Sequence, residues 1–386
     1  MLAGERGEVV ERMFRLLVRL GDIYGADKMI PVGSVQVAGV SYKSIGDPGL
    51  EFLEDIAKKG VRVKVPTTLN PAGMDLDEWK DLGFSEEFAK KQLRIMDAFK
   101  RMGIMMTVTC TPYLVGNLPR FGEHIAWSES SAVSFANSVM GARTNREGGP
   151  SALAAAICGV TPNYGLHLDE NRSPTVVVNV NAKLNDSADF GALGYHVGKL
   201  VRKGIPYFKG LNHVDVDQLK ALGAAMAASG AVALYHVENI TPEAALVETT
   251  GLAGIEVGDE ELRETYKVLN TGSDPDIVIL GCPHASLKEL ADLACKLEGK
   301  LVKKPLWICT SRAVKDAAAR MGFVELITKA GGRVVSGTCM VVSPIEQMGY
   351  RTTGVNSGKA ANYLPGFCKQ QVVFKKLDDL LEGATR

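Results

Sequence analysis

Three cysteines occur in a local pattern that suits metal binding. Cys110 (TVTCTP), Cys282 (ILGCPH) and Cys339 (SGTCMV) each end an apolar, strand-like run and enter a turn. Ligands of open parallel sheets gather outside the carboxyl ends of the strands, so three thiolates meeting there would suit an iron–sulfur cluster with one non-thiolate site. Cys309 also ends such a run, and buried cysteine is a common packing residue. The spacing therefore leaves both the set and its role open.

Two glycine-containing turns after predicted strands are candidate anion sites. Residues 39–47 (GVSYKSIGD) and 67–73 (TTLNPAG) combine small, hydroxyl and amide residues. Backbone N–H groups in such turns, or at a helix N-terminus, can bind an anion. On composition alone, two ordinary turns are the favoured interpretation.

Further charged side chains lie in loops. Glu129 in SESS suits acid–base work or substrate binding, although Ser and Glu are also common helix caps. Arg143 and Arg146 in GARTNREGG suit a carboxylate or phosphate, and a solvated loop explains them as well. Lys359 in GVNSGKA could hold an anion, but this segment lacks the spacing and the hydroxyl residue of a phosphate-binding loop. The six histidines show no metal-ligand spacing and are interpreted as structural.

The composition predicts a globular protein of two or three domains. The chain has 386 residues, 46% of them hydrophobic and 23% charged, with a formal net charge of +0. With no net positive charge, the chain has no overall electrostatic attraction to nucleic acid or to an anionic membrane, so neither is expected to be its main partner. The N-terminus has the pattern of an amphipathic helix, no stretch is apolar enough to span a membrane, and the odd number of cysteines favours reduced thiols. We therefore expect a cytoplasmic protein.

Strand and helix patterns alternate along the chain, which predicts an α/β fold with parallel sheets and helices on their faces. We expect three modules, over residues 1–170, 171–260 and 261–386, with Cys110 in the first and the other two patterned cysteines in the last. Ser286 with Glu289 forms a capping box that opens the helix after Cys282. The predicted strands include residues 35–40, 61–65, 104–109, 176–180 and 232–236, and the predicted helices residues 85–102, 130–140, 190–201 and 216–229.

Eight segments, taken together, resemble one family. In chain order they are GVSYKSIGD, TTLNPAG, TCTPYL, WSESSA, GARTNREGG, LGCPH, SGTC and NSGKAANY. The sequence resembles the large subunit of the aconitase X family, a branch of the aconitase superfamily. The resemblance implies an aconitase-like architecture of several α/β/α modules, with the cluster and substrate in a cleft at the carboxyl ends of the strands.

The resemblance also implies roles for individual residues. Cys110, Cys282 and Cys339 match the family's cluster ligands, which places them above Cys309. Glu129 and Ser130 are expected to be catalytic, orienting the substrate hydroxyl and carboxylate. The expected substrate-binding residues are Gly39, Val40, Ser41, Asn70, Pro71, Glu129, Ser130 and Lys359, to which we add Arg143 from its loop.

The cofactor implied is an iron–sulfur cluster, with 4Fe-4S as the leading form. Ordinary aconitases place two of their three cluster cysteines in a CxxC pair, and this sequence has none. A smaller cluster or a single iron therefore stays open. The activity implied is that of a hydro-lyase: iron acts as a Lewis acid, and (R)-5-phosphomevalonate becomes trans-anhydromevalonate 5-phosphate in the archaeal mevalonate pathway.

The resemblance further implies a partner. In the superfamily a serine on a small, swivelling domain acts as the base, and that domain is absent from this chain, so we expect a small subunit to supply it and the chain alone to be inactive. The expected ligand is a small anion. An alternative substrate is cis-3-hydroxy-L-proline. A rival of another class is a non-catalytic iron–sulfur scaffold or RNA-binding protein, against which the zero net charge and the lack of a basic stripe both weigh.

Overall fold

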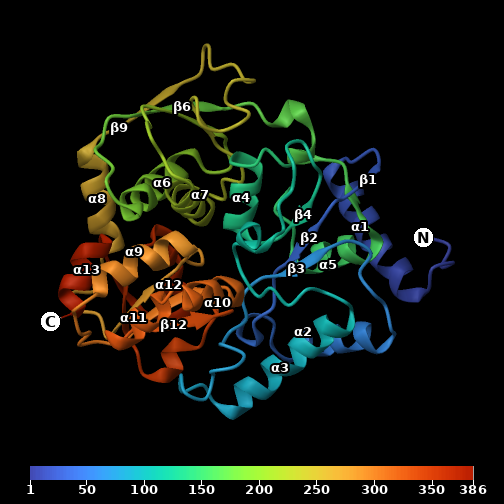
Figure 1. Cartoon of the computed structure of the whole chain (residues 1–386). Helices are drawn as coiled ribbons and strands as arrows, with labels where there is room; N and C mark the ends of the chain where they lie inside the picture. Colours follow the sequence, from blue (N-terminus) through green and yellow to red (C-terminus); the bar gives the residue numbers. More distant parts are fainter. Residues whose placement is uncertain (386) are drawn as a thin grey trace.

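The computed structural model describes residues 1–385, in which three parallel sheets follow one another along the chain (Figure 1). The N-terminal module has the sheet β3-β2-β4, the middle module the sheet β8-β7-β6-β9, and the C-terminal module the sheet β12-β11-β10-β13-β14. Neighbouring strands within these three sheets are all parallel. The predicted α/β fold with parallel sheets is confirmed.

The N-terminal module contains residues 39–47 and 67–73, the two candidate anion sites, and a small antiparallel pair of strands, β1 with β5. Ser85 caps helix α3, accepting a hydrogen bond from the Phe88 N–H at 3.3 Å, as its sequence pattern predicts. The elements are α1 (Glu8–Tyr24), β1 (Met29–Pro31), β2 (Val35–Val37), α2 (Tyr42–Lys58), β3 (Thr67–Leu69), α3 (Glu86–Arg101), β4 (Ala126–Trp127), α4 (Ser130–Ser138), α5 (Gly149–Cys158) and β5 (Val160–Pro162).

The middle module packs helices α6 and α7 together against one face of its sheet, at the top of Figure 1. Asp186 and Asp215 cap these two helices with capping boxes. The elements are β6 (Val176–Val180), α6 (Ser187–Val201), β7 (Pro206–Lys209), α7 (Val216–Gly230), β8 (His236–Val237), β9 (Gly254–Val257) and α8 (Asp259–Leu269).

The C-terminal module carries the largest sheet, and its predicted capping box of Ser286 with Glu289 is confirmed. Its central strand, β10, is buried along its whole length, as a strand covered on both faces must be. The elements are β10 (Ile277–Leu280), α9 (Leu287–Leu297), β11 (Leu306–Thr310), α10 (Arg312–Arg320), α11 (Phe323–Lys329), β12 (Arg333–Ser336), β13 (Thr352–Val355), α12 (Gly358–Cys368), β14 (Gln371–Phe374) and α13 (Leu377–Ala384).

Two predicted strands of the N-terminal module do not form. Residues 61–65 have no strand, because Val63 and Lys64 donate their N–H groups to the carbonyls of Met102 and Ala156 at helix ends. Residues 104–109 make only an isolated bridge, Met105 to Thr68. Val108 has a φ of 46°, outside the β region, so continuous pairing stops there.

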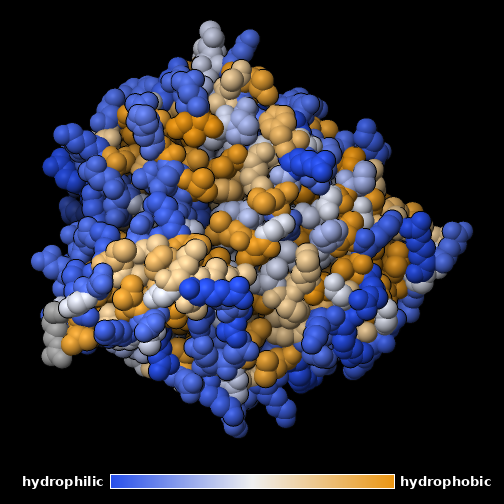
Figure 2. Space-filling view, viewed as in Figure 1, coloured by the Kyte–Doolittle hydropathy of each residue, from blue (hydrophilic) through white to orange (hydrophobic). Residues whose placement is uncertain are grey.

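The modules share a core. One hydrophobic cluster includes Phe208 of β7, Ile279 of β10 and Phe374 of β14, and it extends to Phe88 of α3. On the face drawn in Figure 2, hydrophobic and weakly polar residues gather across the middle and hydrophilic residues cover the margins. Within residues 1–385, no helix is both long enough and apolar enough to cross a membrane.

Candidate active site

A cavity of about 290 Å³ opens where the carboxyl ends of strands from two modules meet. Gly39, Asn70 and Glu129 follow β2, β3 and β4, whereas Cys282 and Cys339 follow β10 and β12. Parallel strands direct their carboxyl ends to one edge, which is why turns distant in sequence converge here. The lining residues are Ala38, Gly39, Asn70, Pro71, Cys110, Ser128, Glu129, Ser130, Arg146, Cys282, Cys339, Val341, Val342, Lys359, Tyr363 and Phe367.

The cavity brings Cys110, Cys282 and Cys339 together, and Cys309 is not among its lining residues. Cys309 lies in β11 and is fully buried, so it packs in the sheet. The Cys282 thiol hydrogen-bonds to Cys339, which lowers the pKa of Cys339 to about 7. Burial raises the pKa of Cys110 to about 12. The hydrogen bond to Cys339 and burial raise the pKa of Cys282, so Cys339 is the thiol of the three that ionises most readily.

The three thiols fit an iron–sulfur cluster by the chemistry of the donor set, because thiolates are its usual ligands. Within residues 1–385, no three His, Cys, Asp or Glu side chains form a group that could hold one metal ion. Cluster ligands bind separate irons, so they need not lie as close together as the ligands of a single ion.

Glu129 and Lys359 form a buried ion pair beside the thiols. Their side chains are 7% and 8% exposed. The Lys359 ammonium donates to the Glu129 carboxylate and, at 3.2 Å, to the Ser131 hydroxyl. Glu129 also accepts hydrogen bonds from the Ser130 hydroxyl at 3.2 Å, the Ser131 hydroxyl at 2.5 Å and the Ala132 N–H at 2.8 Å. The carboxylate thus caps α4, and hydrogen bonds hold both of its oxygens in place.

Both members of this pair are charged at neutral pH. Burial by itself would raise the pKa of Glu129, but the Lys359 charge and the hydrogen bonds lower it to about 2. The Glu129 charge likewise raises the pKa of Lys359 despite burial. A carboxylate of such low pKa is a poor proton donor near pH 7, and it is suited to orienting a hydroxyl group.

A close approach of two helices places Lys359. Gly191 in α6 faces Gly358, the first residue of α12. A Cβ on Gly358 would lie 2.5 Å from the Gly191 carbonyl oxygen, and a Cβ on Gly191 would lie 2.9 Å from the Gly358 nitrogen. Only glycine at both positions allows α12 to begin here, and Lys359 is its next residue.

Family models of aconitase X match the chain in three parts. The first domain matches residues 1–170, the second residues 174–267 and the third residues 275–386. The chain belongs to the aconitase X family. The family resemblance inferred from the eight segments is thereby confirmed, and so is the aconitase-like fold.

Curated and solved relatives agree with this family. The chain is 58% identical to the phosphomevalonate dehydratase large subunit of Methanocaldococcus jannaschii, over 99% of this chain and 98% of that protein. It is 36% identical to the cis-3-hydroxy-L-proline dehydratase of Pseudomonas aeruginosa, over 100% of this chain and 68% of that protein. The crystal structure of Thermococcus kodakaraensis aconitase X in its holo form matches with a TM-score of 0.93 and 51% identity, covering 99% and 97% of the two chains.

Three predicted residues of this aconitase X chain lie outside the cavity lining. Val40 and Ser41 are each 1% exposed, and the Ser41 hydroxyl donates to the Val342 carbonyl at 2.7 Å. The Arg143 guanidinium is paired with Asp169 and lies 3.8 Å from Glu243. Arg143 is thus held by carboxylates and is not among the residues that line this cavity, so its expected role in substrate binding stays a prediction.

Arg146 lines the cavity where Arg143 was expected, and within residues 1–385 it makes no ion pair. Tyr363 and Phe367 were not singled out from the sequence of this aconitase X chain. They follow Lys359 at spacings of four and eight residues on α12, and this helical period was the signal that could have found them.

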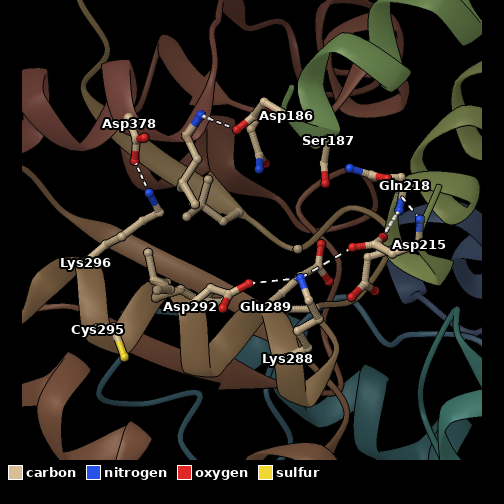
Figure 3. A pocket seen from close by; sticks show the side chains of 18 of the residues that line it. Asp186, Ser187, Asp215, Gln218, Lys288, Glu289, Asp292, Cys295, Lys296 and Asp378 are labelled. Atoms are coloured by element: carbon tan, nitrogen blue, oxygen red, sulfur yellow. Dashed lines mark hydrogen bonds and ion pairs between the residues drawn. The ribbon is translucent and has the colours of Figure 1, made fainter. Parts of the chain in front are cut away.

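A second cavity of this aconitase X chain, about 460 Å³, lies between α6 and α7 on one side and α9 and α13 on the other (Figure 3). None of Cys110, Cys282 and Cys339 lines it. Lys288 lies between Asp292 at 3.1 Å and Asp215 at 3.4 Å, and Lys296 pairs with Asp378. Because these charges satisfy one another, we place the chemistry in the smaller cavity.

Proposed function

We propose that this chain is the large subunit of a dehydratase that removes water from (R)-5-phosphomevalonate and forms trans-anhydromevalonate 5-phosphate. The observation that carries the proposal is the meeting of three cysteines with the Glu129–Lys359 pair in one cavity. Support comes from the 58% identity to a relative named phosphomevalonate dehydratase large subunit, against 36% to one named for cis-3-hydroxy-L-proline.

Cys110, Cys282 and Cys339 would hold an iron–sulfur cluster, of which 4Fe-4S is the form with one iron left without a thiolate. When bound, the cluster supplies a Lewis-acidic iron to the substrate hydroxyl. The low pKa of Cys339 favours binding, since ligands must be deprotonated thiolates.

Glu129 and Ser130 would orient the leaving hydroxyl. Glu129 stays ionised because its pKa is about 2, so it accepts a hydrogen bond from the hydroxyl instead of losing a proton to it. The Ser130 hydroxyl lies on the same cavity wall and can turn from Glu129 to the substrate carboxylate. In the elimination, a base would take the proton from the carbon next to the carboxylate as the carbon–oxygen bond breaks. The departing hydroxide would take up one proton to become water, which balances the proton taken by the base.

Arg146 would hold the phosphate. The cavity lining contains two cations, Lys359 and Arg146, and Lys359 is engaged by Glu129. Arg146 is exposed at the edge and makes no ion pair within residues 1–385, so its guanidinium is available for a bidentate contact with a phosphate dianion.

A separate small subunit would supply the base and cover the cavity. The relatives named large subunit imply such a partner for this chain. Phe367 at the cavity is 58% exposed, so its ring is available for contact with such a partner.

The test is an anaerobic assay of water loss from 5-phosphomevalonate by the iron-reconstituted chain together with its small subunit. We expect turnover that is lost with a chelator or without the partner. Cys339→Ser should abolish turnover, whereas the matched control Cys158→Ser, which changes a buried thiol on α5 that does not line the cavity, should retain it. Arg146→Ala should raise KM about 10- to 100-fold, as expected for a lost charged hydrogen bond, with a smaller effect on kcat.

Unchanged turnover in Cys339→Ser would contradict the cluster mechanism. Turnover of cis-3-hydroxy-L-proline in place of 5-phosphomevalonate would reassign the substrate. An iron-loaded complex inactive on both would favour the non-catalytic scaffold, and a salt-sensitive RNA complex of the chain alone would favour RNA binding.

A further inference from the structure

His284 lies among the three cysteine-bearing turns and has no part in the chemistry described above. It follows Cys282 by two residues and is 1% exposed. A buried imidazole is costly unless its nitrogens are hydrogen-bonded, so the partners of His284 indicate what it does.

All four polar groups of His284 have partners. The backbone N–H donates to the Cys110 sulfur at 3.2 Å, and the backbone carbonyl accepts from the Lys220 ammonium at 3.3 Å. Ring Nε2 lies 2.7 Å from the Thr338 carbonyl oxygen, and ring Nδ1 lies 2.9 Å from the Thr109 hydroxyl. The residue is fully satisfied.

The carbonyl of Thr338 fixes the tautomer. A carbonyl oxygen can only accept, so Nε2 carries the ring proton and donates it. Nδ1 is then the acceptor, and the Thr109 hydroxyl donates to it. The ring thus donates one hydrogen bond, to Thr338, and accepts one, from Thr109.

The two ring partners are the residues that immediately precede the other two cysteines. Thr109 precedes Cys110 in the N-terminal module, and Thr338 precedes Cys339 after β12. His284 itself belongs to the turn of Cys282. One rigid ring therefore spans the two other turns from within the third, and it does so across two modules.

We propose that the His284 side chain is a positioning residue that holds the Cys110 and Cys339 turns at the separation a cluster requires. That these turns hold a cluster rests on the proposed function. The tie, by which we mean the two ring hydrogen bonds from His284 to Thr109 and Thr338, is a property of the chain itself. Imidazole is suited to it because its two nitrogens are fixed relative to each other, whereas shorter or flexible amides can satisfy only one partner at a time.

The first experiment uses the metal-free chain and needs no activity. Cys110, Cys282 and Cys339 are alkylated under native conditions, and their rates are followed by peptide mass spectrometry. His284→Asn keeps an acceptor for Thr109, and His284→Gln keeps a donor for Thr338. We expect each variant to raise the rates about five- to tenfold, because each loses one buried hydrogen bond that closes the site.

The second experiment loads both variants anaerobically with iron and sulfide. Iron retention against a chelator should weaken about 10- to 100-fold, the usual effect of removing a group that orients metal ligands. The electron paramagnetic resonance spectrum of the reduced cluster should also change, since the ligand geometry changes.

His236→Gln is the matched control. His236 is fully buried, and its Nε2 lies 2.9 Å from the Arg172 carbonyl, but it is on β8 of the middle module, away from the cysteines. We expect a lower melting temperature with unchanged thiol rates. Thiol rates and cluster spectra like those of wild type in both His284 variants, or equal changes in His236→Gln, would overturn the proposal. Faster alkylation in a protein that never dehydrates 5-phosphomevalonate would support the tie and reject the proposed function.

Discussion

Glu129 and Lys359 are buried together, so each charge depends on the other for its stability. A buried carboxylate that lost its lysine would be an uncompensated charge, which is among the most destabilising changes a protein interior can undergo. The Glu129 oxygens are further held by Ser131 and by the Ala132 N–H. The pair is therefore a fixed element of charge beside the thiols.

The low pKa of Glu129 predicts a pH dependence of stability. Its pKa is about 2 in the fold against 4.5 ordinarily, so its contribution is complete above pH 4.5 and is lost as the pH falls toward 2. Gln imitates the protonated form. The advantage of wild type over Glu129→Gln in free energy of unfolding should shrink by roughly 1 kcal/mol between pH 6 and pH 3.5, measured by urea unfolding of the metal-free chain.

Glu147→Gln is a control of opposite sign. Glu147 is buried with only Ser151 and Thr161 hydroxyls as partners, and burial raises its pKa. Its charged form is disfavoured in the fold, so wild type should gain on Glu147→Gln as the pH falls toward the ordinary glutamate pKa of 4.5. Parallel trends in the two variants would contradict the assignment of Glu129 as a stabilised carboxylate.

At the scale of elements, strand ends and one helix assemble the cavity. The turns after β2, β3 and β4 face those after β10 and β12, and α12 adds Lys359, Tyr363 and Phe367 from one face. Because α12 begins against α6, its position depends on the contact between Gly191 and Gly358.

Gly191→Ala tests this dependence. The added Cβ would lie 2.9 Å from the Gly358 nitrogen, so the first turn of α12 must move and carry Lys359 with it. We expect a loss of about 1–3 kcal/mol in unfolding free energy, typical of overpacking, together with lower kcat of the two-subunit enzyme. Gly366→Ala is the control, since Gly366 lies in the same helix with open space around it and alanine there should be neutral or stabilising. Full activity and stability in Gly191→Ala would show that the close approach is not required.

The sequence predicted elements whose signals are local. The helix capped by Ser85 and the buried strand at residues 176–180 formed as their periodicity indicated. The apolar runs at residues 61–65 and 104–109 were predicted to be strands, because periodicity contains no information on tertiary hydrogen bonds or on single backbone angles. In the structure, N–H groups of residues 61–65 bond to helix ends, and Val108 has a positive φ. The choice between strand and loop was made by tertiary partners.

The same limit applies to the site. The local pattern of an apolar run that ends in a cysteine picked out Cys110, Cys282, Cys309 and Cys339 alike, and the family resemblance chose three of these four. The Glu129–Lys359 pair joins residues 230 apart, and His284 reaches Thr109 across 175 positions, so no spacing rule contains them. Arg143 and Arg146 lie in one loop with the same composition around them, and only the fold decides that Asp169 engages one and leaves the other at the cavity.

At the scale of the whole molecule, a buried arginine joins the middle module to the N-terminal module. Arg172 lies just before β6, and its side chain, 3% exposed, donates to Glu243 at 2.6, 2.9 and 3.1 Å. It also donates to the carbonyls of Asn137 in α4, Ala142 just after α4 and Leu166 after β5. The middle module is thereby fastened to the N-terminal segment that carries Glu129.

This junction predicts a non-additive mutational cycle. Arg172→Met should lower the free energy of unfolding by about 3–5 kcal/mol, because the buried Glu243 carboxylate loses its hydrogen-bonded partner and keeps only Arg143, at 3.8 Å. Arg172→Met combined with Glu243→Met should cost less than the sum of the two single changes, since neither charge then remains. Lys288→Met is the control, because the Lys288–Asp292 pair is 62% and 53% exposed and should contribute less than about 1 kcal/mol. Additive costs would mean that Arg172 acts through its carbonyl partners and not through Glu243, and the junction would then depend on the hydrogen bonds to Asn137, Ala142 and Leu166.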